Sequence, residues 1–550
     1  MKKLTSLLLI VIVLSSLMAA CATPTPQVVE KEVVVKETVV VEKEKVVIAT
    51  PVPVELPTLV MVMELDDVVT LDPHYAYETT NLMIHANTYD TLVEYRPTDL
   101  TKVAPRLADE WTASADGLTY TFKLHPGIKF TSGNPVTAED VRFSWMRLIN
   151  LKGNPSFYAD LIDTVEAVDE LTVKVTLTEA SPAFLGVIAT PAMSVLDSEV
   201  VKEHGGTDAE DADQTDKAKE WLDQNSAGSG PFIQTAWTPK AEVVLEANPN
   251  YWRGAHRIGK IIIKHVADAS TALQLLQRGD ADIVHTLDTD LVDQVAGDAN
   301  LELVIGQTLN MNYLAMSPDP ELGGPLADKK VRQAVAYAVD YDGIMDLLNG
   351  YADYAPSVIP LGVMGVDPAM KRSRDLDKAG ELLAEAGYGG GGPELELAYG
   401  AAPGALRETI AAKLKADLEE VGIVVNLRPM EVSVYLSDMR AQKLSMALGG
   451  WTPDYLDPTM WSDYYSYPDR GIAYRIKYDS PEAAKWAKVV ASEFDLTKRE
   501  TAVRNLVQVL VDEVPFIMLY QPQQLVAFSK DIRGFAYHPV HFVNFFDLGK

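Results

Sequence analysis

The pattern of apolar and polar residues in the globular part of the chain predicts both strands and helices. Residues 59–63 form a short apolar run, as a buried strand does. Asp116-Gly117 is a hairpin signal, and residues 118–124 alternate with a period of two, which predicts a strand. Thr137 is placed as the N-cap of a helix with acidic residues in its first turn. The pattern therefore predicts a mixed α/β protein.

Two neighbouring segments extend this prediction. The residues after Tyr75 have a helical pattern that continues through Tyr89. Residues 127–130 and 132–136 predict a further strand and a turn.

The first 21 residues are predicted to be a targeting segment. Lys2 and Lys3 give a positive start, residues 4–17 are apolar, and small residues precede Cys21. The segment resembles a bacterial lipoprotein signal, in which Cys21 is acylated and becomes the mature N-terminus, although Met18 stands where Leu is usual. The alternative is an ordinary secretory signal followed by a stray cysteine.

Residues 22–57 are of low complexity, with Val-rich clumps alternating with Glu/Lys clumps between prolines. We interpret them as a tether, with a sticky strand or a short coiled coil as the alternative. No later apolar run reaches the roughly 18 residues of a membrane span. The lipid alone is therefore expected to hold the protein at the outer face of the cytoplasmic membrane, in the cell envelope or periplasm.

Length and charge narrow the class of protein. A chain of 550 residues is too long for one core, so roughly two or three lobes are expected. The formal charge of −30 argues against nucleic acid or an anionic lipid surface as a partner. Cys21 is the single cysteine, so no internal disulfide can form.

Residues 449–461 are the strongest candidate for a functional site. Residues 444–448 are apolar, as the end of a buried strand would be, and two glycines then allow a close approach of the backbone. The stretch carries two indoles, a phenol and the carboxylates of Asp454 and Asp457, with further tyrosines at 464, 465 and 467. Aromatic walls with fixed anions suit a partly apolar ligand with a positive or hydrogen-bond-donating end. The alternative is an aromatic loop that packs on its own domain.

Several other motifs do not fit the chemistry that they formally suggest. The glycines at 387, 389 and 392 follow a helical pattern and precede a strand. A dinucleotide site needs the opposite order, with the strand before the glycines and the helix after them. Gly254, Gly259 and Lys260 approach a phosphate loop, but a strand follows them. The acidic run 208–213 lacks the central Gly and the distal Glu of a calcium loop. His538 and His541 have no third zinc ligand nearby in the sequence. We therefore expect no metal and no cofactor. No nucleophile motif supports an enzyme, although Asp454 and Asp457 could in principle serve a glycosidase.

An ordered series of sequence landmarks covers essentially residues 58–550. They are residues 111–124 and 127–145, Gly228-Ser229-Gly230-Pro231-Phe232 with Asn248-Pro249-Asn250-Tyr251-Trp252, Val331-Arg332-Gln333-Ala334 with Ala338-Val339-Asp340, residues 377–388 and 418–425, and the Trp451 stretch itself. This series resembles family 5 extracellular solute-binding proteins, the peptide/dipeptide/nickel-type binding proteins of ABC importers. One departure is Ser445, where many relatives carry Asp.

The resemblance implies a two-lobed α/β periplasmic-binding-protein fold of type II, of the large cluster C kind, with an extra inserted lobe. Chain order then assigns residues 58–87, 228–304 and 511–550 to lobe I, 88–227 to the inserted lobe, and 305–510 to lobe II. The crossings near Ile305 and Leu510 are expected to be the hinge.

The resemblance also implies the function: a lipid-anchored, monomeric binding protein that captures peptides by closing its lobes and delivers them to a permease with its ATPase. Asp454 is expected to hold the peptide's α-ammonium, while Trp451 and Thr452 offer backbone groups. Tyr77 and Thr79 are expected to line the other lobe, with plain packing as their alternative role. Two rival functions are an oligosaccharide captor of the same family, and a surface enzyme or adhesion protein on the same fold.

Overall fold

A computed structural model describes residues 56–97, 99–401, 406–540 and 542–550. The predicted signal (residues 1–21), its Cys21 and nearly all of the predicted tether lie outside these residues. Among the described residues, one sheet of 12 strands and a separate sheet of 4 strands are the largest β-structures.

Lobe I is built on the central strand β1 (Thr58–Met63), which pairs in parallel with β10 (Lys260–His265) and with β11 (Ile283–Val284). The predicted strand at 59–63 is confirmed, and its apolar residues are buried in the core of the lobe. The remaining elements of the lobe are α2 (Thr79–Thr88), β8 (Phe232–Thr238), β9 (Glu242–Ala247), α8 (Ala269–Arg278), α9 (Val292–Ala296), β12 (Leu301–Gln307), β19 (Tyr537–His538) and β20 (Phe542–Val543).

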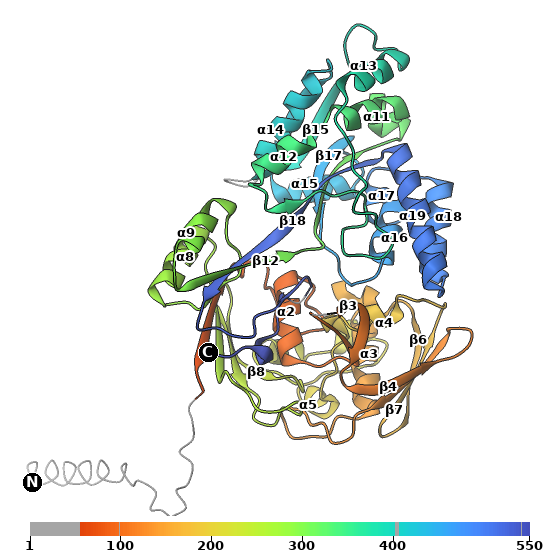
Figure 1. Cartoon of the computed structure of the whole chain (residues 1–550). Helices are drawn as coiled ribbons and strands as arrows, with labels where there is room; N and C mark the ends of the chain where they lie inside the picture. Colours follow the sequence, from red (N-terminus) through yellow and green to blue (C-terminus); the bar gives the residue numbers. More distant parts are fainter. Residues whose placement is uncertain (1–55, 98, 402–405, 541) are drawn as a thin grey trace, which may run out of the picture. The chain divides into compact units, whose positions relative to one another are not determined.

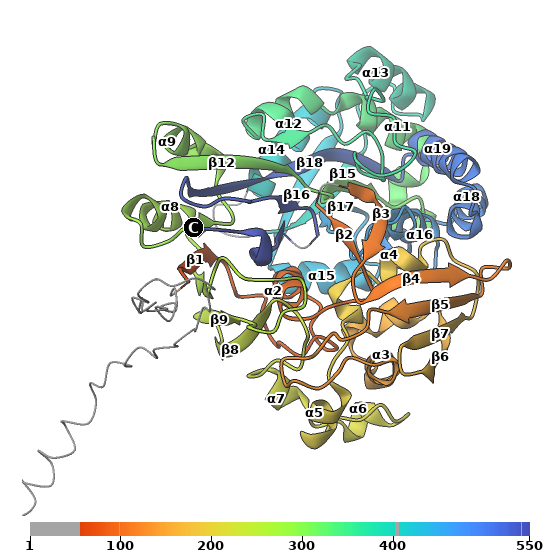
Figure 2. The same cartoon turned by 60° about the horizontal axis from the view of Figure 1, so that its bottom comes forward.

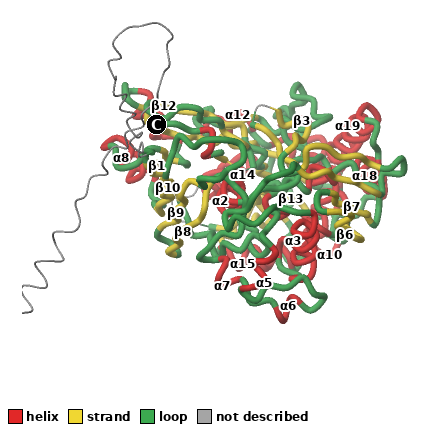
Figure 3. Tube along the Cα trace, turned by 90° about the horizontal axis from the view of Figure 1, so that it is seen from below, coloured by secondary structure: helices red, strands yellow, loops and turns green. Residues whose placement is uncertain are grey.

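The inserted lobe has its own sheet, in the order β4-β5-β7-β6 (Figure 2). The predicted hairpin is confirmed, since β4 (Ala108–Ala113) and β5 (Thr119–Leu124) pair in antiparallel fashion around Gly117. Helix α3 (Ala138–Leu151) begins after Thr137 as predicted, and Asp140 Oδ2 accepts bonds from the Thr137 backbone nitrogen and hydroxyl. Figure 3 shows α5 to α7 grouped beside α3. The other elements are β2 (Val93–Arg96), β3 (Asp99–Pro105), β6 (Ile162–Asp169), β7 (Thr172–Leu177), α4 (Phe184–Val187), α5 (Ser198–Glu203), α6 (Ala212–Thr215) and α7 (Lys219–Leu222).

The strand predicted at residues 127–130 is wrong. Only an isolated bridge joins Lys129 to Pro135 there. Gly127 and Gly133 take positive φ values of 83° and 98°, so the chain turns back on itself within a few residues. The backbone hydrogen bonds close inside this loop, between Phe130 and Asn134, and no strand can extend.

Lobe II is a layer of strands in the order β16-β15-β17-β13 with helices packed on it (Figure 1). Its strands are β13 (Met311–Met316), β14 (Ala352–Asp353), β15 (Glu394–Gly400), β16 (Val424–Met430) and β17 (Met446–Trp451). Its helices are α10 (Pro320–Gly323), α11 (Lys329–Ala338), α12 (Tyr341–Leu347), α13 (Leu376–Glu385), α14 (Leu406–Glu419), α15 (Val432–Arg440), α16 (Thr459–Ser466), α17 (Gly471–Arg475), α18 (Pro481–Ser492) and α19 (Leu496–Glu513).

One long strand, β18 (Phe516–Ser529), belongs to both lobes. Its first part pairs with β13 as far as Tyr520, and its second part pairs with β12 from Gln523 onward. Figure 1 shows it running from the strands of lobe II to β12. The lobe boundaries remain a proposal, and this pairing supports placing the second crossing near residues 521–522 instead of 510, and the first near 308–310.

Candidate ligand-binding site

The candidate stretch begins in β17. The last residues of this strand pair with β13 on one side but not with β15 on the other. On one side β17 pairs with β13 through to Trp451. On the other side its pairing with β15 is confined to Ala447 and Leu448. Gly449 permits the close approach expected of it, because a Cβ atom there would lie 2.8 Å from the Tyr313 hydroxyl oxygen. The β15-facing edge after Leu448 is therefore able to offer backbone groups to an extended ligand.

The aromatic residues of the stretch divide into two groups. Trp461 and Tyr465 are fully buried in the core of lobe II, so the packing interpretation is correct for these two. Trp451 and Tyr464 are only half-buried, and their ring centroids lie 4.8 Å apart. The Trp451 Nε1 atom is buried and has no hydrogen-bond partner among the described residues. Trp451 and Tyr464 are the pair that a ligand could contact.

The two carboxylates also differ. Asp457 accepts bonds of 2.8 and 2.5 Å from the buried guanidinium of Arg499, so its charge is neutralised within lobe II. Asp454 is 9% exposed, and it forms no ion pair with any residue that the structure describes. A paired aspartate of this kind is structural, whereas an unpaired one carries a free buried charge.

Asp454 is enclosed by tyrosines from the opposite side of the lobe junction. The Tyr77 hydroxyl donates a 2.9 Å hydrogen bond to Asp454 Oδ1, and the Tyr158 hydroxyl donates to the Asp454 backbone oxygen at 3.3 Å. The second carboxylate oxygen, Oδ2, is buried without a partner among the described residues. Burial raises the pKa of Asp454 to about 6, and the Tyr77 hydrogen bond only partly opposes this. Within the described part of the chain, the carboxylate therefore has no ion-pair partner, and its Oδ2 atom has no hydrogen-bond donor.

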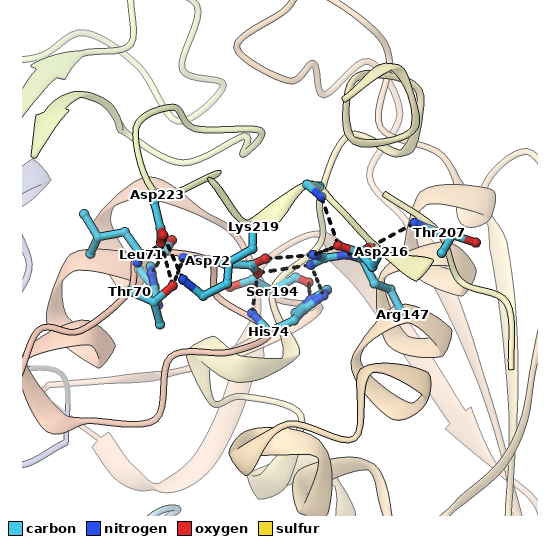
Figure 4. Close-up of polar contacts among 12 residues, drawn as sticks. Thr70, Leu71, Asp72, His74, Arg147, Ser194, Thr207, Asp216, Lys219 and Asp223 are labelled. Carbon is cyan, nitrogen blue, oxygen red and sulfur yellow. Dashed lines mark hydrogen bonds and ion pairs between the residues drawn. The ribbon is translucent and has the colours of Figure 1, made fainter. Parts of the chain in front are cut away.

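The segment that carries Tyr77 is fixed by a buried ion network (Figure 4). Arg147 of α3 donates to both oxygens of Asp72 at 3.0 and 2.7 Å, and its Nε donates to Asp216 at 2.8 Å. All three side chains are fully buried. Burial and the neighbouring Arg147 lower the pKa of His74 to about 3, so this ring is neutral at pH 7. Such a network fixes the path of the chain just before Tyr77.

The remaining predicted residues occupy less decisive positions. Thr452 is exposed directly after β17, and Thr79 is the half-buried first residue of α2. No hydrogen bond of either side chain is found within the described part of the chain. Of the ligand-binding residues that the sequence predicted, the structure thus brings Asp454 and Tyr77 into contact, while the lipidation residue Cys21 lies outside the described residues.

Sequence reasoning missed two arginines of lobe II. Arg475 lies with its guanidinium 5.7 Å from the Trp451 ring centroid. Arg407 Nη2 lies 3.6 Å from the position that a Cβ atom on Gly450 would take. Both side chains are half-buried, and neither forms an ion pair with any residue that the structure describes. In a chain with a net charge of −30, an arginine without an acidic partner is a candidate for binding an anionic group. Only the fold shows which arginines have no such partner among the described residues.

The profile of the bacterial extracellular solute-binding proteins, family 5 (middle region), matches residues 102–472. The chain belongs to this family. Family 5 proteins are transport binding proteins and not enzymes, and the fold is the mixed α/β fold of the type II periplasmic binding proteins.

Relatives of this family 5 protein align over most of their length. The probable D,D-dipeptide-binding periplasmic protein DdpA of Escherichia coli K12 is 29% identical over 481 residues, covering 86% of this chain and 90% of the relative. The di/tripeptide-binding protein 2 of Pseudomonas aeruginosa is 26% identical, and the alignment covers 82% of this chain and 87% of the relative. The solved structure of HbpA2 from Haemophilus parasuis has a TM-score of 0.77 at 26% identity, covering 90% of this chain and 99% of that one.

Two further properties of the family 5 chain concern membranes and metals. Within the described ranges, no helix is long and apolar enough to cross a membrane. In the same ranges, no group of three or more His, Cys, Asp or Glu residues is placed so that it could hold a metal ion. The glycines at 387–392 connect α13 to β15, and Lys260 begins β10, so both phosphate-type motifs lack the helix that they would need.

Proposed function

We propose that this family 5 protein captures short peptides with a free α-ammonium group. The observation that carries the proposal is the Asp454 carboxylate, which is buried at the lobe junction with Oδ2 unpartnered and no cation beside it among the described residues. A charged carboxylate in such a place costs free energy unless a positive group meets it. A primary ammonium fits, because it donates charge-assisted hydrogen bonds to a carboxylate.

The other residues at the junction suit the rest of a peptide. The edge of β17 at Trp451, followed by Thr452, would bond the extended ligand backbone, with Tyr77 and Thr79 facing it from lobe I. Arg407 and Arg475 would meet a carboxylate of the ligand, since they lie near Gly450 and Trp451 and neither is ion-paired within the described ranges.

Capture of this kind works by closure of the two lobes, so that ligand binding shifts an open–closed equilibrium. The closed form would dock on the permease of an ABC import system, which its ATPase drives. We propose that the protein acts as a monomer at the outer face of the cytoplasmic membrane. The similarity to relatives named as dipeptide-binding and di/tripeptide-binding proteins supports the capture of peptides.

The anchor is proposed to be a lipid on Cys21. Changing Cys21 to Ser is expected to abolish acylation and to leave the fold unchanged, because Cys21 lies far before the first strand of the fold, which begins at Thr58. Membrane fractionation and mass spectrometry should find a soluble protein or an uncleaved precursor without lipid. A Ser variant that still carries lipid and fractionates like the wild type would disprove the anchor.

The ligand class is tested by mass spectrometry of whatever co-purifies with the protein, followed by thermal unfolding with the same compound added. A peptide at a hundredfold excess over its Kd is expected to stabilise the folded state by roughly 2.7 kcal/mol. Small-angle scattering should show a smaller radius with the peptide bound. Co-purification of an oligosaccharide, with no stabilisation by free peptides, would favour the sugar-binding alternative, which the Trp451–Tyr464 ring pair could serve.

A further inference from the structure

The inserted lobe also touches lobe II through residues other than Asp454. The hydroxyl of Tyr95 in β2 donates a 2.9 Å hydrogen bond to the backbone oxygen of Leu456, which belongs to the loop between β17 and α16. Gly186 of α4 lies against the same two groups. A Cβ atom on residue 186 would stand 3.0 Å from the Tyr95 hydroxyl oxygen and 3.2 Å from the Leu456 oxygen. Glycine therefore permits a close three-way contact between the lobes here.

A second contact joins the outer edges of the same two lobes. Phe494 lies in the turn between α18 and α19 and is 46% exposed. Its ring reaches Gly117 at the tip of the β4–β5 hairpin, where a Cβ atom would lie 2.8 Å from Phe494 Cζ. Gly117 has a φ of +71°, which this tight turn requires. A large apolar side chain that is exposed on its own lobe is thus partly covered by the other lobe.

We propose that these two contacts form a latch that holds lobe II against the inserted lobe even without ligand. The latch consists of Tyr95, Gly186 and Leu456 at the inner contact, and of Gly117 and Phe494 at the outer contact. None of the five is among the residues to which we assign the peptide. Their role would be to set the fraction of molecules that are closed.

The latch would change the apparent affinity for a ligand only by changing the fraction of protein molecules that are closed. The apparent Kd of a ligand that needs the closed state equals its intrinsic Kd divided by the closed fraction. Contacts that raise this fraction strengthen binding of every ligand equally and do not alter which ligand is preferred. In this respect the inference depends on the proposed capture function, but the closed fraction itself exists without any ligand.

Gly186→Ala is the sharpest test, because its local and its interlobe effects have opposite signs. Residue 186 is helical and its φ is not positive, so alanine is compatible with the local backbone and favours the helix. In the closed state the new methyl group would press on Tyr95 and Leu456. The ligand-free variant should melt at the wild-type temperature or above it, and yet open more often.

Opening is read by hydrogen–deuterium exchange of the full-length protein without ligand. The segments to follow are residues 454–460 of lobe II and 114–118 of the inserted lobe. In Gly186→Ala and in Phe494→Ala, exchange in both segments is expected to rise by about tenfold, because the exchange rate of an amide is proportional to the fraction of molecules in which its protecting contact is open. Leu496→Ala is the matched control, since Leu496 lies two residues from Phe494 and is 65% exposed.

The outcomes separate the latch from the peptide proposal. Faster exchange in the two variants but not in the Leu496 control supports the latch, whatever the ligand proves to be. The latch would be overturned if the two segments exchange as fast in the wild type as in Gly186→Ala and Phe494→Ala. Equal exchange rates in the wild type and all three variants would overturn it as well. Because Phe494 is a half-exposed surface residue, its alanine variant keeps the test decisive should Gly186→Ala disturb the inserted lobe.

Discussion

Asp454→Asn is expected to weaken the binding of a free peptide by about 2–5 kcal/mol, because it deletes one charge of a buried, hydrogen-bonded pair. This corresponds to roughly a thirtyfold to several-thousandfold loss of affinity. Asparagine keeps the shape of the side chain and an oxygen that can accept the Tyr77 hydroxyl. The ammonium of the peptide would then lose its counter-ion in a place where water cannot replace it.

The coupling to the ligand's own charge makes this test specific. N-acetylation of the peptide should cost the wild type a comparable amount and the Asn variant much less, because both changes delete the same interaction. Calorimetry on the four combinations of protein and peptide measures the coupling. If the two losses simply add, Asp454 does not meet the ammonium.

Asp457→Asn supplies the matched control at a distance of three residues. Its partner is Arg499, so the substitution leaves a buried guanidinium without its acid. Removing one partner of a buried ion pair costs on the order of 3–5 kcal/mol of stability. The Asp457 variant should therefore melt earlier, and its binding should show no coupling to N-acetylation.

Without ligand, the Asp454→Asn variant is expected to be more stable than the wild type at pH 7.5. Burial raises the pKa of Asp454 to about 6 in the folded protein, whereas an unfolded chain has a value of about 3.9. The folded state therefore binds the proton more tightly, and the stability from this group is present at low pH and is lost as the pH rises through 6. The difference of about two in pKa corresponds to roughly 3 kcal/mol.

The measurement is the melting temperature of both ligand-free proteins between pH 4 and pH 7.5. The variant should melt higher at pH 7.5, and the gap should close toward pH 4. Burial also raises the pKa of Asp463 to about 7, but this residue is present in both proteins and drops out of the difference. A gap that is constant with pH, or of opposite sign, would mean that Asp454 is not a buried carboxylate without a cation.

The same carboxylate predicts how binding depends on pH. Below about pH 6 the proton competes with the ligand, so affinity for a free peptide should fall by about tenfold per pH unit in the wild type. The peptide's own α-ammonium stays charged in this range, because its pKa is about 8. Asp454→Asn should bind weakly at every pH and without this slope.

Local pattern in the sequence determined much of the scaffold. The alternation after Asp116-Gly117, the cap at Thr137 and the apolar run that became β1 each encode an element through neighbours in the chain, and each prediction was confirmed. Landmarks spread over the chain were sufficient to predict the family and the fold. The strand expected at residues 127–130 failed because two glycines with positive φ close a loop there, and alternation does not report φ.

The site itself was decided by contacts between residues far apart in the chain. Asp454 and Asp457 are near-equivalent in sequence, yet only the packing of α19 brings Arg499 to one of them and leaves the other unpaired. Trp451 and Trp461 likewise differ in burial, since Trp461 is fully buried and Trp451 is only half-buried. Tyr77 reaches Asp454 across 377 positions of the chain, and Gly186 matters because Tyr95 and Leu456 meet beside it. Burial and charge balance depend on the whole surroundings of an atom, and tertiary structure alone fixes those surroundings.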